Sequence, residues 1–218
     1  MGEKRARAGT ENLYERLRMH LDVMPVAFPE SQSGVEIDIL ERFFTEEEAE
    51  VALNMSMLPE TASRIHRRIR RARGMRSFGG EDATYQETED PMSPETVRTH
   101  LDSLVEKRVV NSATVKKRGR TAKVYGKLPF AVGLYEFQVD RLTRGFQSEA
   151  ESYMDEAFMH SFISERPRQM RTIPVNETIL PDRNVSRYDS IRDVIESSKG
   201  PFVVQNCICR QGRELMGE

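Results

Sequence analysis

The chain has 218 residues, a formal net charge of −2 at pH 7 and a charged fraction of 31%. This length can bury a real core in one large domain or two small ones, and a hydrophobic fraction of 38% excludes a largely disordered chain. The near-neutral net charge gives no global attraction to nucleic acids or acidic membranes, so a basic site has to be local. No apolar run is long enough for a membrane span or a signal-peptide core, so we expect a cytoplasmic protein without a membrane partner.

The first part of the chain, residues 1–34, predicts one helix and a proline-rich lead-in. An apolar repeat over about 11–24 places leucines and a methionine on one helix face. Pro25 and Pro29 follow and end this helix, because proline lacks the amide hydrogen that a helix interior needs.

Three further helices are predicted in the next segment. The first ends near Phe44, and the second opens with a capping box in which Thr45 is the N-cap and Glu48 stands three residues later. The third helix follows Pro59 and is expected to end at Gly74, because glycine commonly stands just past a helix.

An aperiodic segment with two glycines and an acidic run separates this helix from the next one. We interpret residues 75–92 as an exposed loop inserted into the domain. The next helix begins with Ser93 as N-cap and Pro94 at the first helical position. Its apolar stripe leaves Arg98 and Thr99 on the outer face.

Two β-prone runs follow around a basic turn that contains Gly119, and they predict a hairpin. Helices followed by a hairpin are the element order of a winged helix-turn-helix domain, which we assign to residues 35–128. The predicted wing carries five cations, which are Lys116, Lys117, Arg118, Arg120 and Lys123.

A helical connector and a small α/β segment are expected after the hairpin. Residues 129–166 keep a helical apolar pattern, with aromatic residues for a core or a dimer seam and Gly145 as a point of bending or splitting. Residues 167–218 have the pattern of strand, helix and strand. The last strand would be buried and would end at Cys207 and Cys209. The whole chain therefore falls in the α+β class.

Two basic stretches make double-stranded DNA a candidate partner. The helix after Pro59 carries seven arginines without an acidic residue, at positions 64, 67, 68, 70, 71, 73 and 76. In a DNA-bound winged helix, the helix that begins at Ser93 would enter the major groove, where Arg98 and Thr99 could read bases. The wing cations would contact phosphates. Acidic residues on the same helix weaken its positive potential, and winged helices also dock proteins, so a docking module without a cofactor stays an alternative.

The two cysteines are the main candidates for chemistry. A disulfide between Cys207 and Cys209 would close almost no loop, so we expect thiols that are free, metal-bound or redox-active. On a strand, alternate side chains point the same way, so both sulfurs could face one iron–sulfur cluster, with Arg210 offsetting its negative charge. The alternative is that two small residues simply end a strand. The four histidines lack ligand spacing and no hydrolase or transferase motif occurs, so we do not expect an enzyme.

A family resemblance lies in the segments MPVAFPESQSGVEIDILERFFTEEEAEVAL, YEFQVDRLTRGF, RTIPV and PFVVQNCICRQGRELMGE. With residues 71–92 as a variable insert, the chain resembles anaerobe proteins described as ferredoxin-like 4Fe-4S binding proteins. The resemblance implies that Cys207 and Cys209 are ligands of a 4Fe-4S cluster and that the protein transfers electrons to a redox partner. A DNA-binding regulator that senses redox state through the cluster is the alternative.

The resemblance also carries one departure. Members of the family continue past this point to further cysteines, so we expect a truncated cluster domain here. The alternatives are a homodimer in which two copies contribute two cysteines each, and a chain that has lost the cluster.

Overall fold

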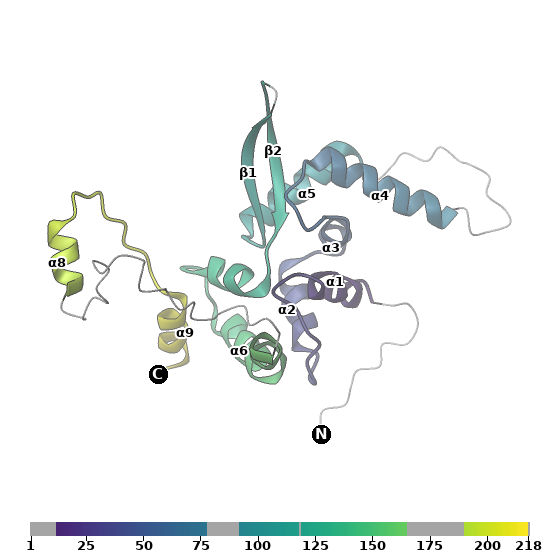
Figure 1. The fold of residues 1–218 in the computed structure, drawn as a ribbon. Coiled ribbons are helices and arrows are strands. Elements are labelled where there is room, and N and C mark those ends of the chain that lie inside the picture. Colours follow the sequence, from purple (N-terminus) through teal and green to yellow (C-terminus); the bar gives the residue numbers. More distant parts are fainter. Residues whose placement is uncertain (1–11, 78–91, 118, 165–189, 218) are drawn as a thin grey trace.

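The computed structural model describes residues 12–77, 92–117, 119–164 and 190–217. These residues form helices and one two-stranded antiparallel sheet, so the predicted α+β class is confirmed. The hairpin projects from one end of the molecule, and α6 (Arg144–Tyr153) lies toward the opposite end (Figure 1). Within the described ranges, every helix is too short or too polar to span a bilayer.

Five helices precede the hairpin, namely α1 (Leu13–Asp22), α2 (Val35–Phe43), α3 (Glu46–Leu53), α4 (Ala62–Ser77) and α5 (Pro94–Glu106). The predicted capping box begins α3, because Glu48 N donates to Thr45 Oγ1 at 3.3 Å and Thr45 N donates to Glu48 Oε2 at 2.9 Å. Ser93 caps α5 in a similar way, accepting from Thr96 N at 3.1 Å. Both predicted helix starts are confirmed.

The predicted end of α4 at Gly74 is wrong, because the helix continues to Ser77. A glycine inside a helix lowers its stability by only about 1 kcal/mol relative to alanine, so packing can override it. The packing of α4 comes from Ile65 and Ile69, which are fully buried, and α4 lies against α5.

One core joins these helices. α1 packs on α2 and α3, and α3 packs on α5. The apolar faces predicted from the sequence are buried, as shown by the fully inaccessible side chains of Leu17, Ile39, Leu40, Leu101 and Leu104.

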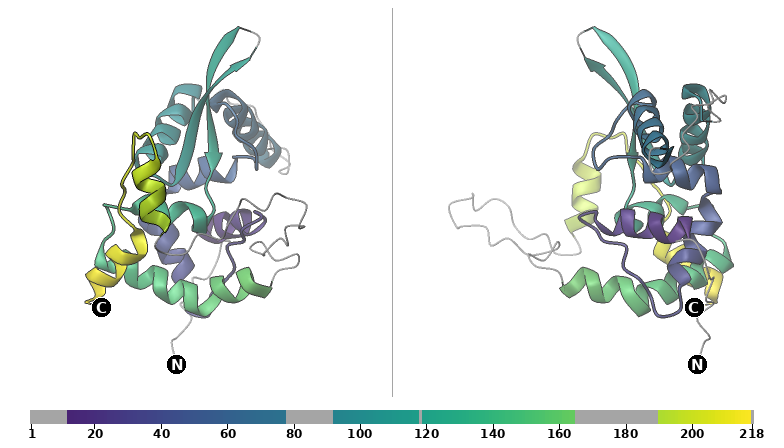
Figure 2. Two further views of the ribbon diagram at one scale, coloured as in Figure 1. Left: turned by 60° about the vertical axis from the view of Figure 1, so that its left-hand side comes forward. Right: turned by 90° about the vertical axis from the view of Figure 1, so that its right-hand side faces the viewer.

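The predicted hairpin consists of β1 (Val110–Lys117) and β2 (Arg120–Lys127). Its register pairs Val110 with Lys127 and Lys117 with Arg120. Gly119 in the turn has a φ of +75°, a left-handed conformation that favours glycine. In both views of Figure 2, the strands extend beyond α4 and α5.

One further pairing adds to the outer side of β2. Glu60, just before α4, donates from its N–H to Tyr125 O at 3.0 Å, and Tyr125 N donates to Glu60 O at 2.8 Å. The segment before α4 is thereby tied to the hairpin, although 65 positions separate the two residues.

The helical connector predicted for residues 129–166 is only partly present. Phe130–Leu134 forms a single irregular turn, and Glu136–Gln138 forms a short 3-10 turn. A continuous helix begins only at Arg144 and passes through α6, a π-type stretch and α7 (Met159–Ser164). Gly145 therefore lies in the first turn of a helix and does not split one.

Contacts with the end of α5 explain why residues 135–141 do not form a continuous α-helix. Arg108 Nη1 donates to the carbonyls of Phe137 and Val139 at 3.2 and 3.1 Å. Gln138 Nε2 donates to Lys107 O at 3.1 Å. These distant partners satisfy polar groups that a continuous helix would have paired locally.

The aromatic residues of the connector form a core. The rings of Phe130, Tyr153 and Phe158 pack on one another, and Phe28 from the N-terminal segment joins them. All four residues are buried. The sequence suggested a core or a dimer seam for these aromatic residues. In the structure, these four form part of the core.

The C-terminal part contains α8 (Ser190–Ser197) and α9 (Ile208–Met216). The helix predicted in this part is confirmed. The predicted buried strand before the cysteines is wrong, because residues 201–206 form no strand and all are exposed. The other strand-like run, at 170–180, and most of the insert at 75–92 lie outside the described residues.

α9 packs against α6, and it is positioned by two kinds of contact. Gly212 lies so close to Gln147 that a Cβ atom on it would stand 2.6 Å from the Gln147 carboxamide. Asp140 holds the other side, because its N–H donates to Gln211 Oε1 at 2.9 Å and its carboxylate accepts from Gln211 Nε2 at 2.8 Å and from Asn206.

Candidate functional site

The exposed face of α5 meets the hairpin at an acidic residue. Asp102 accepts hydrogen bonds from Lys123 Nζ at 2.7 Å and from Tyr125 Oη at 2.8 Å. One turn earlier on α5, Arg98 and Thr99 are exposed. α5 and β2 therefore present one continuous surface at this point.

The electrostatics of this junction fix its charge state. Partial burial alone would raise the pKa of Asp102, but the hydrogen bonds from Lys123 and Tyr125 outweigh it and lower that pKa. Burial and the adjacent Asp102 raise the pKa of Tyr125 to about 12. At neutral pH, Asp102 is therefore an anion that pairs with Lys123, and Tyr125 is a neutral donor.

The predicted wing cations lie on two different faces of the hairpin. Side chains alternate along a strand, so Lys116 and Lys123 share the face of Tyr125, which contacts α5. Arg120 lies on the opposite face with Val124. The side chains of the remaining two wing cations, at positions 117 and 118, lie outside the described residues.

The arginines of α4 also divide into two groups. Arg68 and Arg73 turn toward the body, where Arg73 pairs with Glu50 at 3.0 Å and Arg68 pairs with Glu60 at 2.8 Å. Of the α4 arginines whose side chains the structure describes, those at positions 64, 67, 70 and 71 are exposed, and the side chain at position 76 lies outside the described residues. The basic surface of α4 is therefore smaller than its seven arginines suggest.

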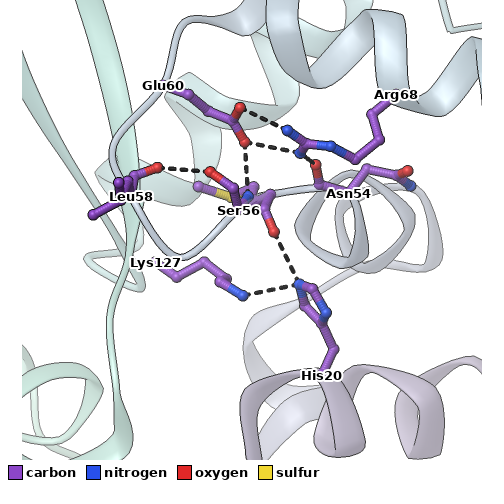
Figure 3. Close-up of polar contacts among 8 residues, drawn as sticks. His20, Asn54, Ser56, Leu58, Glu60, Arg68 and Lys127 are labelled. Carbon is purple, nitrogen blue, oxygen red and sulfur yellow. Dashed lines mark hydrogen bonds and ion pairs between the residues drawn. The ribbon is translucent and has the colours of Figure 1, made fainter. Parts of the chain in front are cut away.

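Figure 3 shows the polar network that holds the base of the hairpin. Glu60 is 5% exposed and accepts from Ser56 N at 2.7 Å and from both terminal nitrogens of Arg68 at 2.8 Å each. Arg68 also donates to Asn54 O. Burial would raise the pKa of Glu60, but the hydrogen bonds from Arg68 and Ser56 lower it. Glu60 is therefore ionised and fully engaged.

His20 and Lys127 complete this network. His20 Nε2 lies 3.0 Å from Met55 O and 2.9 Å from Lys127 Nζ. Burial and the charge of Arg68 lower the pKa of Lys127 to about 8. Burial and the charge of Lys127 lower the pKa of His20. One ring nitrogen cannot donate to Met55 and accept from Lys127 at once, so the tautomer of His20 is coupled to the protonation of Lys127.

The sequence pattern did not identify this network. Its members come from α1, α4, β2 and the segment before α4, and no local spacing connects them. A weak signal existed for Arg68 alone, which lies three residues after the apolar Ile65 and so lies near its helix face.

The cysteines lie at the start of α9 and not on a strand. Cys207 is the N-cap residue, and both thiols are free and exposed. Hydrogen bonds from the backbone N–H groups of Arg210 and Cys209 lower the pKa of Cys207. The Cys207 thiol therefore ionises more readily than an unperturbed cysteine thiol.

The fit of a 4Fe-4S cluster to this site is incomplete. Such a cluster takes four thiolates, and the chain has two cysteines. In the part of the chain that the structure describes, no group of three or more histidines, cysteines or carboxylates could hold a metal ion. The residues present therefore do not form a complete cluster site by themselves.

Two candidate sites result from this geometry, the surface shared by α5 and the hairpin and the cysteine pair on α9. Comparison of the chain with protein-family models, curated proteins and solved structures gave no match. The functional conclusion therefore depends on the residues of these two sites.

Proposed function

We propose that residues 35–128 form a winged-helix domain that binds double-stranded DNA through α5 and the hairpin. The observation that carries the proposal is the joined surface at Asp102, where the exposed face of α5 lies beside a hairpin face with Lys116. The pairing of Glu60 with Tyr125 supports the same domain type, because this single β-bridge places a third backbone segment at the outer side of β2.

The dimensions of these elements suit a duplex. α5 has 13 residues and is about 20 Å long, and the major groove is wide enough to admit such a helix. Arg98 and Thr99 lie in its exposed N-terminal half, the part that contacts base edges in helix-turn-helix proteins. The hairpin extends beyond α5 and can reach the adjacent phosphates (Figure 2).

The acidic residues of α5 oppose binding less than their number suggests. Asp102 is compensated by Lys123, so neither charge is available to attract or repel a phosphate strongly. Arg98 lies 3.9 Å from Glu95, and both side chains are more than half exposed, so this loose pair can open toward DNA. Non-specific binding should be in the range of about 10⁻⁴ to 10⁻⁶ M at physiological salt.

Salt-dependent binding tests this proposal. We would measure the fluorescence anisotropy of a labelled duplex of about 20 base pairs at several salt concentrations between about 50 and 200 mM. Lys116→Glu should weaken binding and reduce the slope of log K against log salt by about 1, as expected for one lost phosphate contact. Arg144→Glu is the matched control, because this exposed arginine begins α6, and α6 lies toward the opposite end of the molecule from the hairpin (Figure 1).

Two results would reject DNA binding by this surface. One is the absence of binding at the lowest salt. The other is an equal loss of affinity in Lys116→Glu and Arg144→Glu, which would indicate non-specific charge effects.

A second candidate is a redox function, which the exposed cysteine pair favours. In this proposal Cys207 and Cys209 would be two ligands of a 4Fe-4S cluster whose other ligands come from a second chain, and the bound cluster would supply electron transfer to a redox partner protein. Anaerobic reconstitution with iron and sulfide should then give a visible chromophore and about two iron atoms per chain when two copies share one cluster. Cys207→Ser should abolish both, and a wild-type chain that remains colourless would refute the shared cluster.

A further inference from the structure

A groove lies between the start of α4 and the hairpin, on the hairpin face opposite to the proposed DNA surface. Its cavity volume is about 780 Å³. Pro59, Thr61 and Arg64 line it on the side of α4, and Val115, Arg120, Ala122 and Val124 line it on the side of the hairpin. The groove therefore has apolar walls and two arginines.

The edge of β2 next to this groove has unused backbone groups. Tyr125 directs both its N–H and its C=O outward to Glu60. In an antiparallel strand, every second residue points its polar backbone groups to the same side, so Lys123 and Thr121 direct theirs outward as well. Among the described residues, Glu60 is the only one paired with this side of β2. An edge of this kind is a template for another strand.

The charge of the groove selects for an acidic ligand. Arg64 and Arg120 are exposed, and neither has a carboxylate partner among the residues that the structure describes. The one carboxylate in the lining, Glu60, is occupied by Arg68 and Ser56. The groove therefore offers two unneutralised guanidinium groups to whatever binds there.

We propose that this groove docks an extended, acidic segment of a partner protein, which adds as a strand to the outer edge of β2. Its backbone pairs with Lys123 and Thr121, and its alternate side chains fall into the groove. A carboxylate among these side chains meets Arg64 and Arg120, and apolar neighbours pack on Val115 and Val124. This docking site goes beyond DNA binding and does not depend on it.

A synthetic peptide tests the docking site directly. The probe is the fluorescein-labelled peptide Thr-Val-Thr-Asp-Thr-Val-Thr, in which valine and aspartate share one face of the strand. We expect the folded full chain to bind it, and Arg64→Glu and Arg120→Glu each to weaken binding about tenfold or more. Arg144→Glu, the same charge change on the exposed first residue of α6, should leave binding unchanged.

Backbone methylation separates strand addition from simple charge attraction. One version of the peptide carries N-methyl groups on its valines and aspartate, and the other carries them on its threonines. Only one set of N–H groups can face β2, so one version should lose binding and the other should retain it. Equal behaviour of the two versions, or no binding of the parent peptide at about 1 mM, overturns the proposal.

The same preparations distinguish this proposal from DNA binding. A chain that binds the duplex and not the peptide overturns the docking site alone. A chain that binds the peptide and not the duplex supports the docking site and overturns the DNA-binding function. Circular dichroism of the Arg64 and Arg120 variants confirms that a lost signal does not come from unfolding.

Discussion

Removing the guanidinium of Arg68 should lower the free energy of unfolding, and the hydrogen bonds between Arg68 and Glu60 give the size of this loss. Glu60 is 4% exposed at its side chain and receives two hydrogen bonds from Arg68. Hydrogen bonds to a charged group contribute about 1.5 kcal/mol each at the lower end, which gives about 3 kcal/mol for two. Arg68 is 42% exposed, so solvent screening reduces this value, and we expect Arg68→Ala to lower the free energy of unfolding by about 2 kcal/mol.

The pH dependence of this loss identifies its origin. The pKa of Glu60 is lowered in the folded state, so its contribution is present above the unfolded pKa of about 4.3 and is lost as the pH falls through the folded value. The difference between wild type and Arg68→Ala should therefore be largest near neutral pH and shrink below about pH 4.

Urea denaturation followed by circular dichroism measures both effects. In thermal unfolding at neutral pH, the same loss of about 2 kcal/mol corresponds to a fall in Tm of about 4 to 8 °C for a chain of this size. Arg70→Ala is the matched control, since Arg70 is exposed on the same helix. The reasoning would be refuted by equal losses in the two variants, or by a difference for Arg68→Ala that stays constant down to low pH.

Three further changes have defined outcomes. Gly212→Ala should loosen α9 and speed its hydrogen exchange, because the new Cβ would stand 2.6 Å from Gln147, whereas Gly145→Ala meets only an ordinary contact and should not. Lys127, with a folded pKa of about 8, binds a proton less readily than in the unfolded chain, so wild-type stability should rise between about pH 8 and pH 10. Urea titrations should show a smaller rise for Lys127→Met, and an identical rise would contradict this assignment. Ser93→Ala should lower the free energy of unfolding by about 1 kcal/mol through the lost N-cap of α5, which urea titration would detect, and an unchanged midpoint would contradict the capping role.

Local chemistry explains which elements could be predicted from the sequence. The N-caps Thr45 and Ser93 act on amides three residues away, and the hairpin turn depends on Gly119 and its neighbours. Periodicity identified the buried faces for the same reason, since residues four apart on a helix share a face.

The elements that were predicted wrongly depend on tertiary contacts, made or missing, that the local sequence does not specify. Residues 135–141 have a helical pattern, but their polar groups bond to the end of α5. The run at 202–204 is rich in β-prone residues, yet it is exposed and unpaired with any described residue. The intrinsic propensity of a segment indicates which secondary structures it can form, and tertiary contacts determine which of them it forms.

The candidate site was predictable only in part. The exposure of Arg98 and Thr99 followed from the apolar stripe of α5. The pairing of Lys123 with Asp102 did not, because it joins two elements whose contact the sequence does not specify. Side chains alternate between the two faces of a strand, but the face of each wing cation is fixed only by the hairpin register. Without that register, positions 116 and 120 could not be assigned to different faces.

The segment at residues 137–141 gives the two candidate sites a shared boundary. It bonds to the end of α5 on one side and, through Asp140, to the helix that carries the cysteines on the other. Thermodynamic linkage makes any coupling through such a segment reciprocal. If a ligand of Cys207 changes the affinity of α5 for DNA by some factor, DNA must change the affinity of Cys207 for that ligand by the same factor.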